Sequence, residues 1–310
     1  MSPRSRQPSE EPMRNSWSPR CASFLLLATM VFGGCAEADA PGTDEPVEAG
    51  AEETADTAQE SLPAGADAAL ARLNASPRHG EWVTIPAGSD SIRAWVVYPE
   101  RSGPAPVVMV VHEIYGLTNW IRAVADQLAA DGFVAIAPDL LTMRNIPTDS
   151  AGDPDRQRAT SEIRELERAD VNRWLGAVAD YGTGLPSTTE RYGVIGFCWG
   201  GSTSFELAVA DPELGAAGVF YGSSPDTQAL ASIQAPVLGL YGGADDRVNS
   251  SIPDAEARMS ELGRFYEPNI YDGAGHGFLR QQDGRDGANL AATRQAWPRT
   301  IQFLKEHLEG

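Results

Sequence analysis

The sequence has few side chains that could form disulfides or act as bases near neutral pH. It contains three cysteines and four histidines among 310 residues. Cys21 and Cys35 both lie within the first 35 residues, so Cys198 is the single thiol in the rest of the chain. An internal disulfide in that part is therefore excluded, and a lone thiol indicates either a reactive group or an inert buried cysteine.

Positive charge and long apolar stretches are also scarce. The formal net charge is −19, from 24 Lys and Arg against 43 Asp and Glu, and no basic patch is present. Nucleic acid is therefore not an expected partner. The apolar run from Ala22 to Gly34 is too short to cross a hydrocarbon core of about 30 Å.

That short run has the organisation of an export signal. Four arginines precede it, and small residues lead to a cysteine in Val31-Phe32-Gly33-Gly34-Cys35. We therefore predict a lipoprotein-type signal peptide at 1–35, lipidation of Cys35 and an exported protein anchored in a membrane of a bacterial cell envelope, periplasmic or cell-surface. A plain secretory signal is the alternative, and Met1 and Met13 both remain possible starts.

An acidic stretch follows the signal. Residues 36–66 contain nine Asp and Glu and neither Lys nor Arg, with Ala, Gly, Pro and Thr making up most of the remainder. Such a composition cannot bury enough apolar surface to fold. The sequence therefore predicts a disordered tether at 36–66 and a folded domain at 67–310.

Apolar runs and helical periodicities alternate along the folded part. Strands are predicted at 82–85, 92–98, 107–111, 133–137, 193–197, 217–221, 237–241 and 265–271, and helices at 67–76, 120–130, 164–181, from 199 onward, 253–262 and 290–308. The first two strands form a hairpin, and 141–155 is a loop. This alternation predicts one α/β domain with a mostly parallel sheet and helices on both faces.

Glycines surround Cys198 in Gly196-Phe197-Cys198-Trp199-Gly200, between a buried strand and a helix. This is the pattern of a nucleophile elbow, in which a reactive side chain lies at a sharp strand-to-helix turn and only small residues fit two positions before and after it. Cysteine stands here where serine is more familiar. The elbow predicts that Cys198 is a catalytic nucleophile.

A base and an acid follow Cys198 in the order that an elbow-type fold requires. His276 lies in Gly273-Ala-Gly275-His276-Gly277, directly after the last predicted strand. Asp245 follows the strand 237–241 and is the preferred acid. Its neighbour Asp246 could share that role, and Asp245 could alternatively be a turn residue without a catalytic role.

Glu113 follows the buried strand 107–111, at the edge where an α/β sheet opens its crevice. A carboxylate beside a thiol raises the pKa of the cysteine and could accept its proton. A surface ion pair is the alternative role. His112-Glu113 begins like a zinc-binding H-E-x-x-H motif, but residue 116 is glycine, so neither a metal nor another cofactor is expected.

Four motifs together resemble the dienelactone hydrolase family, a branch of the α/β-hydrolases. They are His112-Glu113-Ile114-Tyr115-Gly116, Gly196-Phe197-Cys198-Trp199-Gly200-Gly201, Asp245-x-x-Val248 and Gly275-His276-Gly277-Phe278, and the resemblance covers residues 77–308. It implies an α/β-hydrolase fold, a triad of Cys198, Asp245 and His276, and a thiol-activating role for Glu113.

The resemblance also implies further site residues. The backbone N–H groups of Ile114 and Trp199 would form the oxyanion hole, and Arg158 and Arg280 would hold a substrate carboxylate. Trp199 is bulkier than the leucine of the best-known members. Those members are also cytoplasmic and unanchored, so their lactone substrate does not transfer directly.

The expected function is hydrolysis of a small lactone or activated ester through a thioester intermediate by a monomer. One alternative is a tethered binding or sensor protein that keeps the fold without turnover, and another is an acyltransferase. Ester burst kinetics together with pH-dependent alkylation of Cys198 would favour an enzyme over a binding protein.

Overall fold

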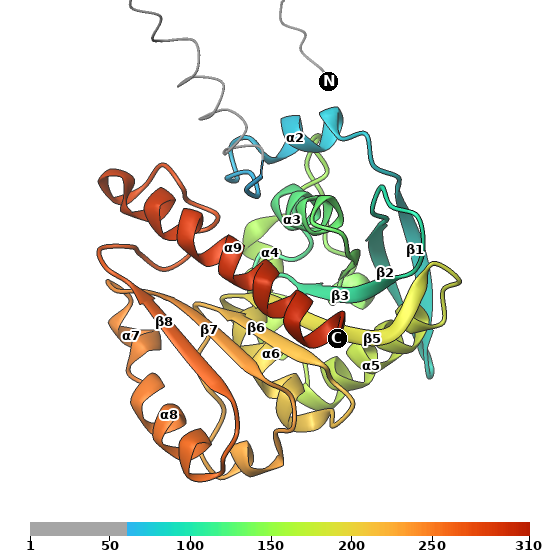
Figure 1. The fold of residues 1–310 in the computed structure, drawn as a ribbon. Coiled ribbons are helices and arrows are strands. Elements are labelled where there is room, and N and C mark those ends of the chain that lie inside the picture. The colour runs from blue at the N-terminus through green and yellow to red at the C-terminus, as the bar shows by residue number, and fades with distance from the viewer. Residues whose placement is uncertain (1–60) are drawn as a thin grey trace, which may run out of the picture. The chain divides into compact units, whose positions relative to one another are not determined.

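The apolar runs of the sequence become the central strands of one eight-stranded sheet in the computed structural model, which describes residues 61–310 (Figure 1). The spatial order is β1-β2-β4-β3-β5-β6-β7-β8. The hairpin strands β1 and β2 are antiparallel, β2 pairs antiparallel with β4, and all later pairs are parallel. The strands are β1 (Gly80–Ala87), β2 (Asp90–Val97), β3 (Ala105–Val111), β4 (Val134–Pro138), β5 (Thr188–Phe197), β6 (Ala216–Phe220), β7 (Val237–Gly242) and β8 (Tyr266–Tyr271).

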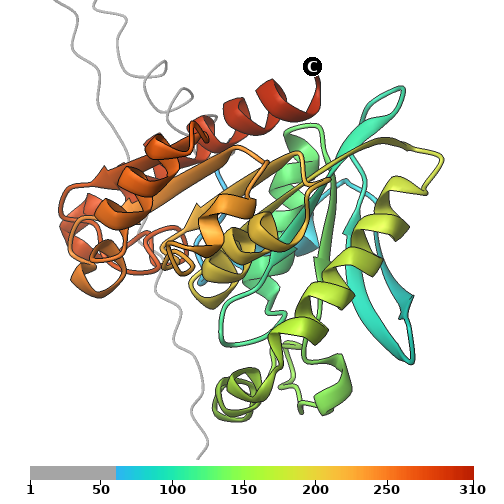
Figure 2. The ribbon, with the colours of Figure 1, turned by 90° about the horizontal axis from the view of Figure 1, so that it is seen from below.

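Helices cover both faces of this sheet (Figures 1 and 2). One apolar core lies between the sheet and α5, α6 and α8, and a second lies between the sheet and α2, α3 and α9. The helices are α2 (Ala69–Ala75), α3 (Asn119–Ala130), α4 (Arg156–Glu162), α5 (Arg168–Thr183), α6 (Trp199–Ala210), α7 (Asp246–Asn249), α8 (Ile252–Glu261) and α9 (Ala288–Leu308). The predicted α/β-hydrolase architecture, a mostly parallel sheet between two helical layers, is confirmed.

The segment before α5 differs from the prediction. The helix predicted over 164–181 begins at Arg168, and the short helix α4, which we did not predict, precedes it. The side chain of Asp155 caps α4 by accepting a hydrogen bond from the backbone N–H of Arg158 (2.8 Å). Only Ala159 of α4 is buried, so this helix has no apolar periodicity for a sequence pattern to detect.

The described chain starts inside the segment assigned to the acidic tether. Leu62 is 3% exposed and belongs to the core beside α3. The carbonyl of Ala64 accepts a hydrogen bond from the indole of Trp120 (3.1 Å), and that of Pro63 accepts one from Gln282 (2.7 Å). The packed chain therefore extends back beyond residue 67, to Leu62.

The other N-terminal predictions fall outside the described residues. These are the signal peptide at 1–35, the lipidation site Cys35 and the tether from 36 to 60. Among the helices of residues 61–310, none combines the length and the apolar character needed to cross a membrane.

Parallel pairing places the carboxyl ends of β3, β5, β6 and β7 at one edge of the sheet. His112 and Glu113 follow β3, Cys198 follows β5, and Asp245 follows β7 within a few residues. β8 is parallel to β7, and the loop that carries His276 leaves the same edge. In open α/β sheets this is the edge at which ligands bind.

Candidate active site

Cys198 has a strained backbone, with φ 58° and ψ −113°, between the end of β5 and the start of α6. Such a conformation costs a non-glycine residue about 1–3 kcal/mol and is concentrated at functional sites. A Cβ at Gly196 would overlap the carbonyl of Gly200, and a Cβ at Gly200 would overlap the carbonyls of Val111 and His112. The flanking glycines are thus required by close backbone contact, and the turn is the predicted elbow.

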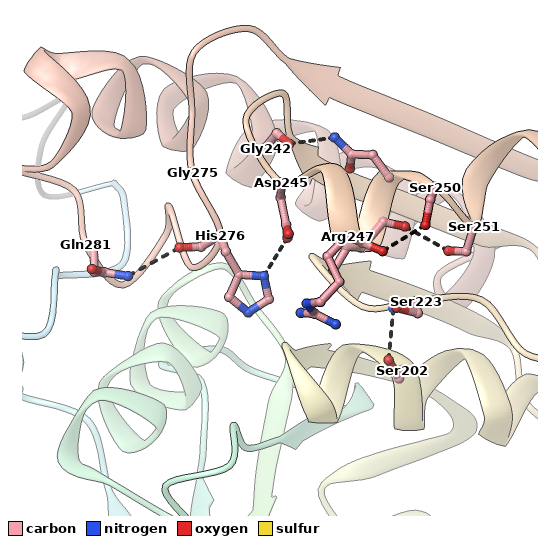
Figure 3. A network of polar contacts seen from close by, with 12 residues as sticks. Ser202, Ser223, Gly242, Asp245, Arg247, Ser250, Ser251, Gly275, His276 and Gln281 are labelled. Atoms are coloured by element: carbon pink, nitrogen blue, oxygen red, sulfur yellow. Dashed lines mark hydrogen bonds and ion pairs between the residues drawn. The ribbon is translucent and has the colours of Figure 1, made fainter.

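His276 and Asp245 form the base–acid pair that the sequence suggested. Nδ1 of His276 lies 2.5 Å from Oδ2 of Asp245, which is buried (Figure 3). Because an ionised carboxylate only accepts hydrogen bonds, Nδ1 carries the proton and Nε2 is left to act as a base. Asp246 is exposed. Of the two candidate acids, therefore, Asp245 is the one paired with His276.

Tyr221 connects this pair to the elbow, and the sequence analysis missed it. The N–H of Cys198 donates to the carbonyl of Phe220 (3.0 Å), which places the elbow beside the residue that follows β6. That residue is Tyr221, at φ 41°, and its buried ring meets the His276 ring with 5.2 Å between centroids. The signal that could have found it is its position at the carboxyl end of a central strand.

The thiol of Cys198 is protonated in the resting site. Burial and the nearby Glu113 raise its pKa to about 11. The backbone N–H of Trp199 and the cationic Arg247 act in the opposite direction and lower this pKa. Figure 3 shows the guanidinium of Arg247 projecting toward His276, and this cation is a second residue that the sequence analysis missed.

Glu113 is buried beside two arginines. Burial raises the pKa of its carboxyl to about 7, while Arg280 and Arg156 both lower it. Nε of Arg280 lies 2.8 Å from Oε2 of Glu113, a close ion pair in which the Nε–H is not directed at an acceptor. The guanidinium groups of Arg280 and Arg156 both lie over the ring of Tyr115, at 5.4 and 4.8 Å from its centroid.

Arg158 does not join this group. Its side chain is 59% exposed and forms an ion pair with Glu162, 2.9 Å away on the same helix. Residues two apart on a helix point in very different directions. α4 thus turns Arg156 toward Tyr115 and turns Arg158 toward Glu162.

The two residues predicted to form the oxyanion hole pack against the same small apolar cluster. The side chains of Ile114 and Trp199 both contact this cluster, which includes Leu141. The Trp199 ring also stacks on His112, with 5.9 Å between centroids and planes 20° apart.

His112 has a structural role. Its Nδ1 donates to the carbonyl of Glu113 (2.8 Å), and its Nε2 accepts from the N–H of Leu140 (3.2 Å). With both ring nitrogens occupied, His112 holds the backbone that precedes Ile114. Within residues 61–310 no three His, Cys, Asp or Glu side chains are close enough together to hold a metal ion.

The sequence profile described as "Dienelactone hydrolase family" matches residues 92–308. The chain belongs to the dienelactone hydrolase family. This confirms the resemblance inferred from the four motifs, and the match includes every residue of the candidate site. Membership of this family makes the protein a hydrolase.

Relatives in the dienelactone hydrolase family support this assignment. An Escherichia coli O157:H7 protein named "Putative carboxymethylenebutenolidase" is 31% identical over 238 residues, which cover 73% of this chain and 86% of that protein. A Klebsiella pneumoniae crystal structure titled "Putative Dienelactone Hydrolase" matches with 26% identity and a TM-score of 0.65, over 74% of this chain and 99% of that one. A dienelactone hydrolase-like promiscuous phosphotriesterase from metagenomic libraries has 25% identity and a TM-score of 0.64, with the same coverage.

Proposed function

We propose that the protein hydrolyses lactones or activated carboxylic esters through a thioester on Cys198. The observation that carries this proposal is the paired His276 and Asp245 at the same sheet edge as a thiol held in a strained elbow. A nucleophile, an adjacent base and an orienting acid are the components of covalent acyl transfer. Family membership supports the same reaction class.

The first step needs a proton acceptor for the thiol. Glu113 is the group we assign, because its charge acts directly on the pKa of Cys198. The pKa of the carboxyl, about 7, lies below that of the thiol, about 11, so proton transfer from Cys198 to Glu113 is unfavourable before a substrate binds. A substrate carboxylate that pairs with Arg280 would neutralise the cation that lowers the pKa of Glu113. The pKa of Glu113 would then rise toward that of the thiol, and Glu113 would become a stronger base.

The thiolate then attacks the carbonyl carbon, and a sulfur–carbon bond forms as the carbonyl π electrons move to oxygen. The N–H groups of Ile114 and Trp199 are assigned to this oxyanion, and the positive end of α6 supports them. When the tetrahedral intermediate collapses, the carbon–oxygen ester bond breaks. Glu113 gives the departing oxygen the proton that it took from the thiol, so the alcohol leaves neutral and Glu113 is again a carboxylate.

Water completes the reaction. Nε2 of His276 removes a proton from a water molecule, which attacks the thioester carbonyl, while Asp245 stabilises the resulting imidazolium. The carbon–sulfur bond breaks, the acid is released, and His276 returns the proton to the sulfur. The net change is one ester and one water converted to one acid and one alcohol, or to a hydroxy acid from a lactone.

The substrate class is tested by a panel of lactones and aryl esters with and without a free carboxylate. Arg156→Gln is expected to raise KM for the acidic substrates about tenfold and to leave KM for the neutral ones unchanged, since one charge-assisted hydrogen bond stabilises by about 1.5–3 kcal/mol. Arg158→Gln is the matched control on the same helix. Its ion pair with Glu162 predicts little change for either class. Equal effects of the two variants would contradict the proposal that Arg156, which shares the Tyr115 ring with Arg280, binds the substrate carboxylate in place of Arg158.

Export and anchoring are proposed from the sequence of residues 1–35. Cells that express the full chain are expected to incorporate labelled palmitate into the protein and to retain it in the membrane fraction. Cys35→Ser should lose the label and release the enzyme. Unchanged labelling of that variant would rule out Cys35 as the attachment site.

A further inference from the structure

A hollow of about 520 Å³ lies among the β1–β2 hairpin, the start of α3 and the loop after β4, and Cys198 is not among its lining residues. Its lining is partly apolar, with Leu117, Leu141, Ile146 and Pro154, and partly polar. Leu141 and Pro154 also pack against Gly116, at the end of the Glu113–Gly116 segment. Two residues that line the hollow therefore contact the chain segment that follows Glu113. A volume of this order is typical of sites for small organic ligands.

Two arginines share one aromatic ring at this hollow. The guanidinium of Arg93 lies 3.7 Å from the centroid of the Trp82 ring, and that of Arg122 lies 5.3 Å from the same ring and 4.4 Å from the Trp95 ring. Arg93, Arg122 and Trp82 all line the hollow. Cation–π contacts hold the guanidinium groups in place, yet they bring two like charges together.

Neither cation has a carboxylate partner among residues 61–310, where no ion pair includes Arg93 or Arg122. Arg122 donates to the side-chain oxygen of Asn119 (3.0 Å), but its Nε and the indole nitrogen of Trp95 are buried without an acceptor. Burial and the charge of Arg93 lower the pKa of Arg122, while the charge of Asp153 raises it. Asp153 and Asp139 thus offset part of this positive charge from a distance, but neither forms an ion pair with Arg93 or Arg122.

The nearby carboxyl groups are engaged with backbone donors. Asp139 lines the hollow and accepts from the N–H of Leu141 (3.1 Å), and its pKa is raised by burial. Asp153 accepts from the N–H of Asn119 (2.6 Å). Nη1 of Arg122 donates to Asn119, so Nη2 of Arg122 and the guanidinium of the exposed Arg93 are the groups available to an incoming oxyanion.

We propose that this hollow binds a small organic oxyanion, a carboxylate or phosphate group on a flat apolar body. The oxyanion would take charge-assisted hydrogen bonds from Arg93 and Arg122. Its body would pack against Leu117, Leu141 and Ile146, which an inorganic ion would leave uncovered. Such a ligand would contact Leu141, which also packs against Gly116.

Calorimetric titration of the full chain with benzoate, phenyl phosphate, benzamide and inorganic phosphate tests the proposal. Benzoate or phenyl phosphate is expected to bind at least tenfold more tightly than benzamide or inorganic phosphate. The double variant Arg93→Gln, Arg122→Gln is expected to lose at least tenfold in that affinity and to retain its hydrolytic rate. Arg93→Gln alone changes an exposed side chain and provides the same test if the double variant folds poorly.

The Arg280→Gln variant separates this hollow from the active site. If the organic anions bind in the hollow, Arg280→Gln keeps their affinity while the Arg93 variant loses it. The reverse pattern would place the anion at Arg280 in the active site and overturn the proposal. Equal binding of benzamide and the organic anions would overturn it as well. Equal binding of inorganic phosphate would overturn the requirement for an apolar body.

Discussion

Cys198→Ala is expected to lower kcat/KM for lactones and aryl esters by at least about 10⁴-fold, because the residual groups of a triad enzyme supply only a small part of its acceleration. The thiol forms the only covalent bond to the acyl group in the proposed reaction. Alanine removes the sulfur and leaves the elbow backbone, His276 and Asp245 in place. The rate should be measured by steady-state hydrolysis with active-site titration of the parent enzyme.

A melting temperature close to that of the parent would show that the variant is folded. Cys198→Ser is the conservative comparison, since it restores a nucleophilic atom whose proton is much harder to remove, and it should recover part of the activity. Hydrolysis by the alanine variant within tenfold of the parent would contradict the assignment of Cys198 as nucleophile.

His276→Ala is expected to stop the reaction at the thioester. Glu113 can still accept the thiol proton in this variant, so the first equivalent of alcohol or phenol is released, but no base remains to activate water. Steady-state turnover should fall by about 10³-fold, within the range that general-base removal and loss of triad function produce. Intact-mass measurement should find one acyl group attached at Cys198.

His79→Ala is the matched control. The His79 side chain is 70% exposed and stacks on Tyr98, on the hairpin side of the sheet. Its loss should therefore change neither the initial burst of product nor the steady-state rate. If His276→Ala shows neither a burst nor an acyl adduct, then His276 rather than Glu113 accepts the thiol proton, and the division of labour between the two bases is wrong.

The sequence predicted the framework well, for local reasons. Continuous apolar runs such as 107–111 and 237–241 can be satisfied only between two helical layers, so they identified the central strands. The elbow was recognisable because close backbone contact admits only glycine at 196 and 200. The pairing of Asp245 with His276 followed from chain order, since each lies shortly after a parallel strand.

Features that depend on side-chain direction or distant contacts were not predictable in the same way. Arg156 and Arg158 look equivalent in the sequence, and only the unpredicted helix α4 turns Arg156 to Tyr115. Tyr221 and Arg247 belong to the site because the ends of β6 and β7, which they follow, lie at the same edge of the sheet as the end of β5. The packing of Leu62 depends on contacts with α3 and the chain around Gln282, far along the sequence.

The raised pKa of Cys198 gives the resting protein a chemical resistance that its mechanism does not require. Peroxides oxidise thiolates rather than thiols. With a pKa of about 11, only about 10⁻⁴ of the molecules carry a thiolate at pH 7, against a few per cent for an ordinary cysteine. Burial of the sulfur and, after it, the charge of Glu113 thus protect Cys198 from oxidants between turnovers, and the same carboxylate accepts the thiol proton when an ester is bound.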